Sequence, residues 1–261
     1  MYRFQPTVLC AAAMLGLLTA ACQTNLGAEV RDEFSQTVPL DANGEFEISN
    51  VNGEIEIATW NRNEVQILAT KSAKNAADLE DVQVVVTGSG DRVEVETELP
   101  KGWNRSGSVS YRITLPASVN LDADTVNGSV SVNGVAGPMD LHSVNGRVEA
   151  TGAVAPVSAN TVNGQLTIRY AATPKSGEHE FETVNGSVRV YLPASVAGRF
   201  HAGSVNGSIE TDFPLQVTKA RFGPSRSLDG ELGSGGDVSF SFNTVNGSID
   251  IRNSETTAAN R

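Results

Sequence analysis

Val126-Asn127-Gly128 opens the run of repeated tripeptides that decides the fold of this chain. Val-Asn-Gly occurs eight times in 261 residues, and the in-phase copies from Val126 to Val205 follow one another at steps of 18 to 22 residues. The copy at Val132 is out of phase, and we interpret it as the return turn of one repeat. Leu228-Asp229-Gly230 is a degenerate copy that divides the last gap. A regular period near 20 residues is typical of stacked-repeat architectures.

The residues on both sides of the tripeptide alternate between apolar and polar. In the last copy Phe240 and Phe242 precede the tripeptide, Ile249 and Ile251 follow it, and polar residues separate the members of each pair. Alternation with a period of two predicts half-buried β-strands. The phase of the alternation changes across Asn-Gly, so the chain turns a corner there. We expect this corner to use the positive φ that Asn and Gly tolerate.

Two architectures fit this pattern. Asn-Gly is a strong signal for a two-residue turn, so each repeat fits a β-hairpin. Alternatively, each repeat is one coil of a solenoid, and each strand pairs in parallel with its counterpart one repeat later. We favour the solenoid because its equivalent corners stack their Asn amides, and each hydrogen bond adds about 1 kcal/mol. The prediction is an all-β fold, a parallel β-solenoid or β-helix of roughly 18–23-residue coils with Val-Asn-Gly corners. The predicted structural Asn ladder consists of Asn52, Asn127, Asn145, Asn163, Asn185, Asn206 and Asn246.

The N-terminal residues 1–21 are predicted to be a signal peptide for export. Arg3 precedes an apolar run, Val8 to Ala21, that is too short to span a bilayer. Within the solenoid, the N-terminal part is less regular and includes a short helix. The predicted organisation is a tether over residues 22–45, a solenoid domain over residues 46–252, its less regular part over residues 46–120, the helix over residues 72–81 and a disordered tail over residues 253–261.

The end of the export signal, Leu18-Thr19-Ala20-Ala21-Cys22, resembles a bacterial lipobox, which implies lipidation of Cys22. Thr19 departs from that pattern because Leu is usual three places before the cysteine. The alternative is an ordinary secretory signal cut near Ala21 or Ala28. An unpaired thiol is a liability in an oxidising compartment, and the only other cysteine lies in the discarded segment. By resemblance to Gram-negative sorting, Gln23 permits delivery to the outer membrane, facing the periplasm or the surface.

Composition and charge restrict the possible partners. The formal net charge is −11, and no basic run is present, so nucleic acid is excluded as a partner. Anionic lipid would also repel the chain, so we expect its contact with a membrane to be through the lipid anchor. Only 6% of the residues are aromatic and 25 are Gly, which suits a thin core with glycine corners.

Three carboxylates are the best candidates for chemistry. Asp122 and Asp140 lie four residues before the Val of adjacent repeats, and Asp124 is two residues from Asp122. Stacked strands lie about 4.8 Å apart, so these groups should be neighbours. Such a spacing suits a weak cation site or the two carboxylates of a retaining glycosidase. We favour a solvated acidic face because no Lys or Arg shares their column to stabilise a developing charge.

The three histidines do not share a column in the repeats. His142, His179 and His201 stand at different positions of different repeats, so they are predicted to be isolated surface or rim residues. A metal site needs three convergent ligands. We therefore predict no metal site built on histidine, and no cofactor.

The repeats resemble the putative-adhesin β-strand-repeat family of bacterial envelope proteins, a domain of unknown function. The resemblance rests on the Thr/Ser-Val-Asn-Gly-Ser-Val repeats, on Leu115-Pro116-Ala117-Ser118-Val119, and on the helix-then-strand stretch from Lys71 to Val86. It covers residues 46–252 and also fits the lipobox-like start. The resemblance implies a β-helix-like solenoid and an envelope location, and it supplies no catalytic residues.

Together these features predict a non-enzymatic cell-envelope lipoprotein that serves as a rigid scaffold or an adhesin-like binding surface. Its expected partners are the membrane, through the lipid anchor, and an envelope protein or glycan. Two alternatives stay open. One is a polysaccharide-active β-helix enzyme that uses Asp122, Asp124 and Asp140, and the other is a sensor subunit of an envelope signalling system.

Overall fold

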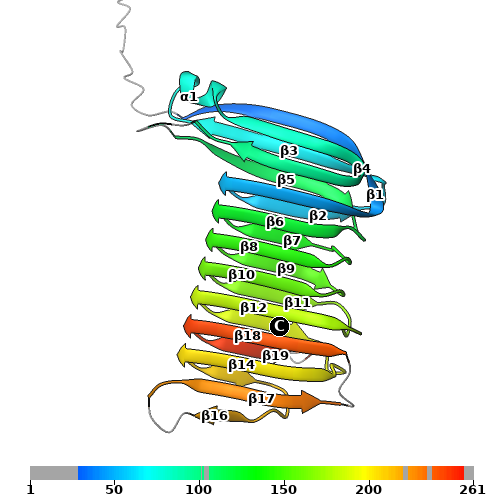
Figure 1. The fold of residues 1–261 in the computed structure, drawn as a ribbon, viewed down its shortest axis with the longest axis vertical. Coiled ribbons are helices and arrows are strands. Elements are labelled where there is room, and N and C mark those ends of the chain that lie inside the picture. The colour runs from blue at the N-terminus through cyan, green and yellow to red at the C-terminus, as the bar shows by residue number, and fades with distance from the viewer. Residues whose placement is uncertain (1–28, 101, 103–105, 220–222, 234–236, 256–261) are drawn as a thin grey trace, which may run out of the picture.

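The computed structural model describes residues 29–100, 102, 106–219, 223–233 and 237–255. The predicted signal peptide and Cys22 lie outside the described residues. The described chain is nearly all strand and winds into a stack of coils, with helix α1 at the N-terminal end (Figure 1). Each regular coil gives one strand to each of two facing sheets, and the apolar core lies between the sheets. The all-β prediction is confirmed.

We name the two faces of the stack sheet A and sheet B. In order along the stack, sheet B contains β4 (Gln83–Glu98), the second half of β1 (Val30–Asn52), β6 (Asn120–Asn127), β8 (Met139–Asn145), β10 (Val157–Asn163), β12 (Gly177–Asn185), β18 (Val238–Asn246), β14 (Gly198–Asn206), β17 (Arg226–Leu232) and β16 (Val217–Lys219). Sheet A contains the first half of β1, β3 (Glu64–Ala73), β5 (Ser108–Pro116), β2 (Ile55–Trp60), β7 (Val130–Asn133), β9 (Val148–Ala153), β11 (Leu166–Tyr170), β13 (Val188–Leu192), β19 (Ile249–Asn253) and β15 (Ile209–Thr211).

The middle of the stack shows how the sequence pattern builds one coil. Val157 and Ala159 of β10 are buried, and after the corner Leu166 and Ile168 of β11 are buried as well. β10 pairs in parallel with β8 and β12, whereas β11 pairs in parallel with β9 and β13. The two strands that flank a corner therefore belong to different sheets. The solenoid prediction is confirmed, and the hairpin alternative is wrong.

The stacking order departs from the chain order at the last repeat. β18 lies between β12 and β14, and β19 lies between β13 and β15, all in parallel pairs. Figure 1 shows this coil, in orange-red, inserted between the coils of β12 and β14. The expectation that every strand pairs with its counterpart one repeat later is wrong here. Aromatic packing accounts for the position, because Phe242 stacks on Phe181 at 5.2 Å between ring centroids and Phe240 stacks on Phe200 at 4.8 Å.

Antiparallel strands cover both ends of the stack, a feature that the repeat pattern does not predict. At the N-terminal end, β3 pairs antiparallel with β1 and β5. The predicted tether is therefore wrong from Val30 onward, where β1 begins and directs Val38 and Leu40 into the core. At the other end, β17 pairs antiparallel with β14, so Leu228-Asp229-Gly230 lies inside a strand and is not a corner.

The predicted helix and tail are also shorter than expected. Helix α1 spans only Ala76–Glu80, because β3 continues to Ala73 and the Asn75 side chain caps the first turn by accepting from the Asp78 amide. At the C-terminus, β19 continues to Asn253. The predicted tail from residue 256 onward lies outside the described residues.

The corner glycines are required for close approach rather than for backbone conformation. Among the seven of them, only Gly53 has a positive φ, so the expectation of positive φ at every corner is wrong. A Cβ added to Gly164 would lie 1.8 Å from the carbonyl oxygen of Gly146, and the same overlap recurs at the other stacked corners. At five of the seven corners the residue before Val is a Thr or Ser whose hydroxyl donates to a corner glycine carbonyl of the neighbouring coil, as Thr161 does to Gly146 at 3.1 Å. At the other two, Asn50 stands before Val51, and the Thr125 hydroxyl has no hydrogen-bond partner in the described structure.

His179 is buried in the core, so the prediction of a surface or rim residue is wrong for this histidine. Its Nδ1 accepts from the Val157 amide at 3.3 Å and lies 2.6 Å from the Tyr170 hydroxyl, which therefore acts as a donor. The ring stacks on Phe240. Burial lowers the pKa of His179 to about 4, so the imidazole is neutral at pH 7 and serves as part of the core.

Candidate binding groove

The structure brings the seven predicted asparagines into one line at the corners. Each Nδ2 donates to the Oδ1 of the asparagine in the neighbouring coil at 2.8 to 3.0 Å, always in the same direction along the stack. The line begins at Asn52, whose Nδ2 donates to the Gly107 carbonyl. Its order follows the coils, so Asn246 lies between Asn185 and Asn206. Together with the Thr/Ser hydroxyl row, this ladder holds each coil to the next on a fixed spacing.

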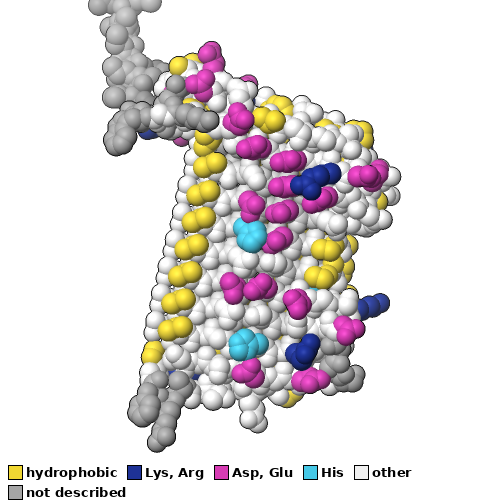
Figure 2. All heavy atoms as spheres, viewed as in Figure 1, with side chains coloured by type: hydrophobic (Ala, Val, Ile, Leu, Met, Phe, Trp, Pro, Cys, Tyr) yellow, Lys and Arg dark blue, Asp and Glu magenta, His cyan; other side chains and the backbone are white. Residues whose placement is uncertain are grey.

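A second line of side chains at the corners is apolar and exposed. We call it the valine stripe, and each member is 39 to 48% exposed although it lies next to a buried Thr or Ser. Figure 2 shows the stripe as a continuous yellow line along one edge of the molecule. Six of the ten exposed large hydrophobic residues of the described chain lie in it. In stacking order the stripe consists of Val126, Val144, Val162, Val184, Val245 and Val205.

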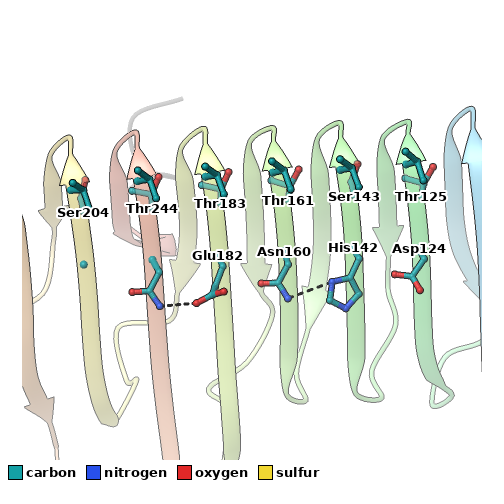
Figure 3. A pocket seen from close by; sticks show the side chains of 18 of the residues that line it. Asp124, Thr125, His142, Ser143, Asn160, Thr161, Glu182, Thr183, Ser204 and Thr244 are labelled. Atoms are coloured by element: carbon teal, nitrogen blue, oxygen red, sulfur yellow. Dashed lines mark hydrogen bonds between the residues drawn. The ribbon is translucent and has the colours of Figure 1, made fainter.

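The valine stripe is one wall of a groove of about 910 Å³ that crosses six coils on the sheet B side. The opposite wall is a polar row two residues before each Val, and Figure 3 shows these side chains in line. Glu182 accepts a hydrogen bond from Asn243 at 2.9 Å, and Arg226 lies at the C-terminal end of the groove. In stacking order the polar row contains Asp124, His142, Asn160, Glu182, Asn243 and Gly203.

The three candidate aspartates lie beside the groove on the outer face of sheet B. Asp122 and Asp140 are register partners in β6 and β8, and Asp124 is the register partner of His142. His142 Nε2 lies 2.8 Å from Asp140 Oδ1. Burial and the neighbouring charges of Asp124 and Asp140 raise the pKa of Asp122 to about 6. Burial also raises the pKa of Asp124, while His142 opposes that shift.

A weak cation site on these aspartates, the lesser alternative to a solvated acidic face, stays a prediction. Among the described residues, no three His, Cys, Asp or Glu side chains are placed so that they could hold a metal ion. The reason is geometric, because Asp122 and Asp140 share one column whereas Asp124 faces the groove beside His142. The cluster also has no Lys or Arg within its columns, and Arg92 is engaged by Glu45 and Glu47. The arrangement supports an acidic surface beside an apolar stripe.

Asp122→Asn is expected to stabilise the protein by about 1 kcal/mol at pH 7.5, after a discount for solvent screening. The pKa of Asp122 in the folded protein, about 6, lies above its ordinary value of 3.8. The ionised carboxylate therefore costs stability above pH 6, and the cost disappears as the pH falls towards 4. Urea denaturation at pH 7.5 and pH 4 measures the difference between the variant and the wild type.

Glu180→Gln is the matched control, since Glu180 lies on an exposed position of the same face. It should change the midpoint little at either pH. A stabilisation by Asp122→Asn that is equal at both pH values would contradict the electrostatic explanation.

The valine stripe was not among the residues predicted from the sequence to form a site. The sequence nevertheless contains a signal for it. The alternation places the Thr or Ser before each Val in the core, so the Val itself must point outward. A Val at an outward position in every exact in-phase copy has no role in the core. Elsewhere, no helix of the described chain has the length and apolar character to cross a membrane. Cys22, the predicted lipidation site, lies outside the described residues.

Several solved bacterial structures match the chain at low sequence identity. A "putative cell adhesion protein" from Clostridium sporogenes shares 12% identity with a TM-score of 0.49, over 86% of this chain and all of that one. A "putative adhesin" from Parabacteroides distasonis shares 10% identity with a TM-score of 0.23, over 84% and 97% of the two chains. A "putative lipid binding protein" from the same species shares 9% with a TM-score of 0.22, over 84% and 96%. At these values the likeness supports no inference about ligands.

No curated protein matches the chain. The model of the family described as Toastrack DUF4097 matches residues 25–252, which covers the stack of coils from β1 to all but the last residue of β19. This match confirms the family resemblance inferred from the Val-Asn-Gly repeats. The chain therefore belongs to the Toastrack DUF4097 family.

Proposed function

We propose that this protein is a non-enzymatic cell-envelope scaffold whose valine groove is an adhesin-like binding surface. The observation that supports the proposal is the valine stripe itself, six exposed side chains in line along a groove that crosses six coils. Contiguous apolar surface of this kind is uncommon on a soluble protein unless it contacts a partner. Scattered exposed valines would not indicate a contact surface, but these six line one groove.

The corners that present the valine stripe are held rigidly. Five of the six valines stand between a buried hydroxyl that bonds the neighbouring coil and an asparagine of the ladder, as Val162 stands between Thr161 and Asn163. A surface that is fixed before binding loses little conformational entropy when a partner binds. Rigidity therefore suits both parts of the proposal, the scaffold and the binding surface.

The envelope location is proposed from the N-terminal sequence. The apolar run that ends at Cys22 favours export and attachment through a lipid on that cysteine. Fatty-acid labelling of the wild-type protein and of Cys22→Ser tests the attachment, since label that persists in the variant would rule out this cysteine as its site.

The wild-type protein is expected to retain components of a bacterial envelope extract through the valine groove. Val144→Thr/Val162→Thr keeps the β-branched shape and replaces one methyl group at each position by a hydroxyl, so retention should fall. Val154→Thr/Val217→Thr is the control, because both valines are exposed and lie outside the groove. Affinity capture on the immobilised full-length proteins measures retention. Equal retention by all three proteins, or polysaccharide cleavage that Asp122→Ala/Asp140→Ala abolishes, would overturn the proposal.

A further inference from the structure

We infer that the valine groove binds an extended peptide whose side chains are alternately aliphatic and basic. The inference rests on the proposed function, because it names the ligand class of the same surface. Two walls of different character lead to it, the aliphatic valine stripe and the polar row, which carries the carboxylates of Asp124 and Glu182.

The aliphatic wall sets the length and shape of the ligand. Neighbouring coils lie about 4.8 Å apart, so the six valines extend over about 24 Å, which is the length of about seven residues of extended chain. Figure 2 shows the stripe running nearly straight along one edge, and the asparagines beside it keep hydrogen bonds of 2.8 to 3.0 Å throughout. A rod-like ligand fits such a wall better than a compact one.

The opposite wall sets the charge of the ligand. Asp124 and Glu182 face the groove, and Asp122, Asp140 and Glu180 follow on the column behind them. Figure 2 shows the acidic residues gathered across this face, with few basic ones. Among the described residues that line the groove, Arg226 at one end is the only Lys or Arg. Basic groups of a ligand would reduce the repulsion within this acidic surface.

An extended peptide matches the separation of the two walls. The valines and the polar row are two residues apart on each strand, which is about 7 Å. Successive side chains of an extended peptide point to opposite sides. A peptide that lies along the groove therefore turns one set of side chains to the valine stripe and the other set to the polar row, which carries Asp124 and Glu182.

Other ligand chemistries satisfy only one wall. An acyl chain would cover the valine stripe and leave Asp124 and Glu182 without a cation. An anionic glycan or nucleic acid would meet the acidic row with charge of the same sign. A basic and aliphatic peptide is the chemistry that both walls favour.

A labelled octapeptide of four Lys-Val units tests the inference with the full-length protein. Fluorescence anisotropy at low salt is expected to show saturable binding that weakens as salt screens the charges. Val144→Thr/Val162→Thr and Asp124→Asn/Glu182→Gln should each weaken binding about tenfold, equivalent to a loss of about 1.4 kcal/mol. The controls Val154→Thr/Val217→Thr and Glu56→Gln/Glu149→Gln change two valines and two carboxylates away from the groove and should alter the Kd less than twofold.

Peptides that lack one chemical feature measure the contribution of each wall to binding separately. A Lys-Ser octapeptide lacks the aliphatic side chains and a Glu-Val octapeptide reverses the charge, so both should bind at least tenfold more weakly than the Lys-Val peptide. Equal binding of the Lys-Ser peptide, or equal losses in groove and control variants, would overturn the inference. If a fluorescent fatty acid binds instead, with dependence on Val144 and Val162 but not on Asp124 and Glu182, the ligand class is wrong while the proposed binding surface stands. If the groove variants also retain envelope components like the wild type, the proposed function fails as well.

Discussion

Gly164→Ala is expected to lower the stability of the protein by at least about 4 kcal/mol, among the largest effects of a single methyl group. The added Cβ would lie 1.8 Å from the carbonyl oxygen of Gly146 in the neighbouring coil. That oxygen is backbone, and it also accepts the Thr161 hydroxyl, so it cannot move without opening the stack. Urea denaturation followed by circular dichroism measures the shift in midpoint.

Gly203→Ala is the matched control for this prediction. Gly203 lies in a strand of the same sheet, and an added Cβ there would meet only the Asn243 side chain at 3.4 Å. The control should stay within about 1 kcal/mol of the wild type, because its backbone conformation suits any residue. Similar midpoints for Gly164→Ala and Gly203→Ala would show that the corners do not depend on close approach.

The position of the substituted corner should determine how many coils lose their folded structure. Gly164 lies in the middle of the stack, whereas Gly207 lies near its C-terminal end and has the same overlap of 1.8 Å, here with the Gly247 carbonyl. Each coil contacts only its neighbours, so Gly207→Ala should loosen the last coils and leave the rest folded. Hydrogen exchange should then show lost protection in β14 and β15 while β6 to β11 stay protected.

The corner motif could be predicted from the sequence because its residues form hydrogen bonds with residues of the same motif in the neighbouring coil. Stacked copies place Asn next to Asn and Thr or Ser next to a glycine carbonyl, so period and pattern together indicate a ladder. The role of the corner glycine could not be predicted in this way. Positive φ and close backbone approach favour the same residue, and only the coordinates separate Gly53, which has φ 120°, from the other six corners.

The ends of the stack and the binding groove were harder to predict. β1 has three charged residues in a row, Arg31 to Glu33, and contains Pro39, so its first half lacks the alternation that marks the regular strands. That half pairs with β3, an interaction between segments that share no repeat motif. The valine stripe was overlooked for the opposite reason. Val162 and its equivalents belong to the motif, so they were assigned to the fold although their side chains face solvent.

The coil order could not be predicted because every corner has the same motif. Val205 and Val245 are both suited to follow Val184, and chain order favours Val205. Phe242 in the inserted coil supplies the ring that stacks on Phe181, at 5.2 Å, whereas β14 has Ala202 in the equivalent position. Side-chain volume in the core, rather than the repeat motif, therefore selects the neighbour of β12.

A disulfide is expected to form in Val184→Cys/Val245→Cys and not in Val184→Cys/Val205→Cys. Neighbouring strands lie about 4.8 Å apart and alternate strands about 10 Å apart, whereas a disulfide needs Cα atoms within about 7 Å. Both pairs are made in a chain whose two native cysteines are serine, and Val126→Cys/Val144→Cys is the positive control. Mass spectrometry of the oxidised, folded proteins identifies the bonds. A disulfide between positions 184 and 205 would show that the coils follow chain order.

Phe242→Ala then tests why the last coil is inserted. The variant removes the ring that Phe181 stacks on, at a cost of about 3–5 kcal/mol for a Phe→Ala change in a core. Direct pairing of β14 with β12 is compatible in register, since Ala202 and Phe181 share Phe242 as a partner. The disulfide between positions 184 and 205 should therefore appear in the Phe242→Ala background. Phe200→Ala is the control. Phe200 belongs to β14, so the variant removes its ring whether β18 or β14 lies next to β12 and should not change the order of the coils. Should the folded Phe242→Ala protein still form no disulfide between 184 and 205, the aromatic stack would not be what fixes the order, and the connections between the coils would have to do so.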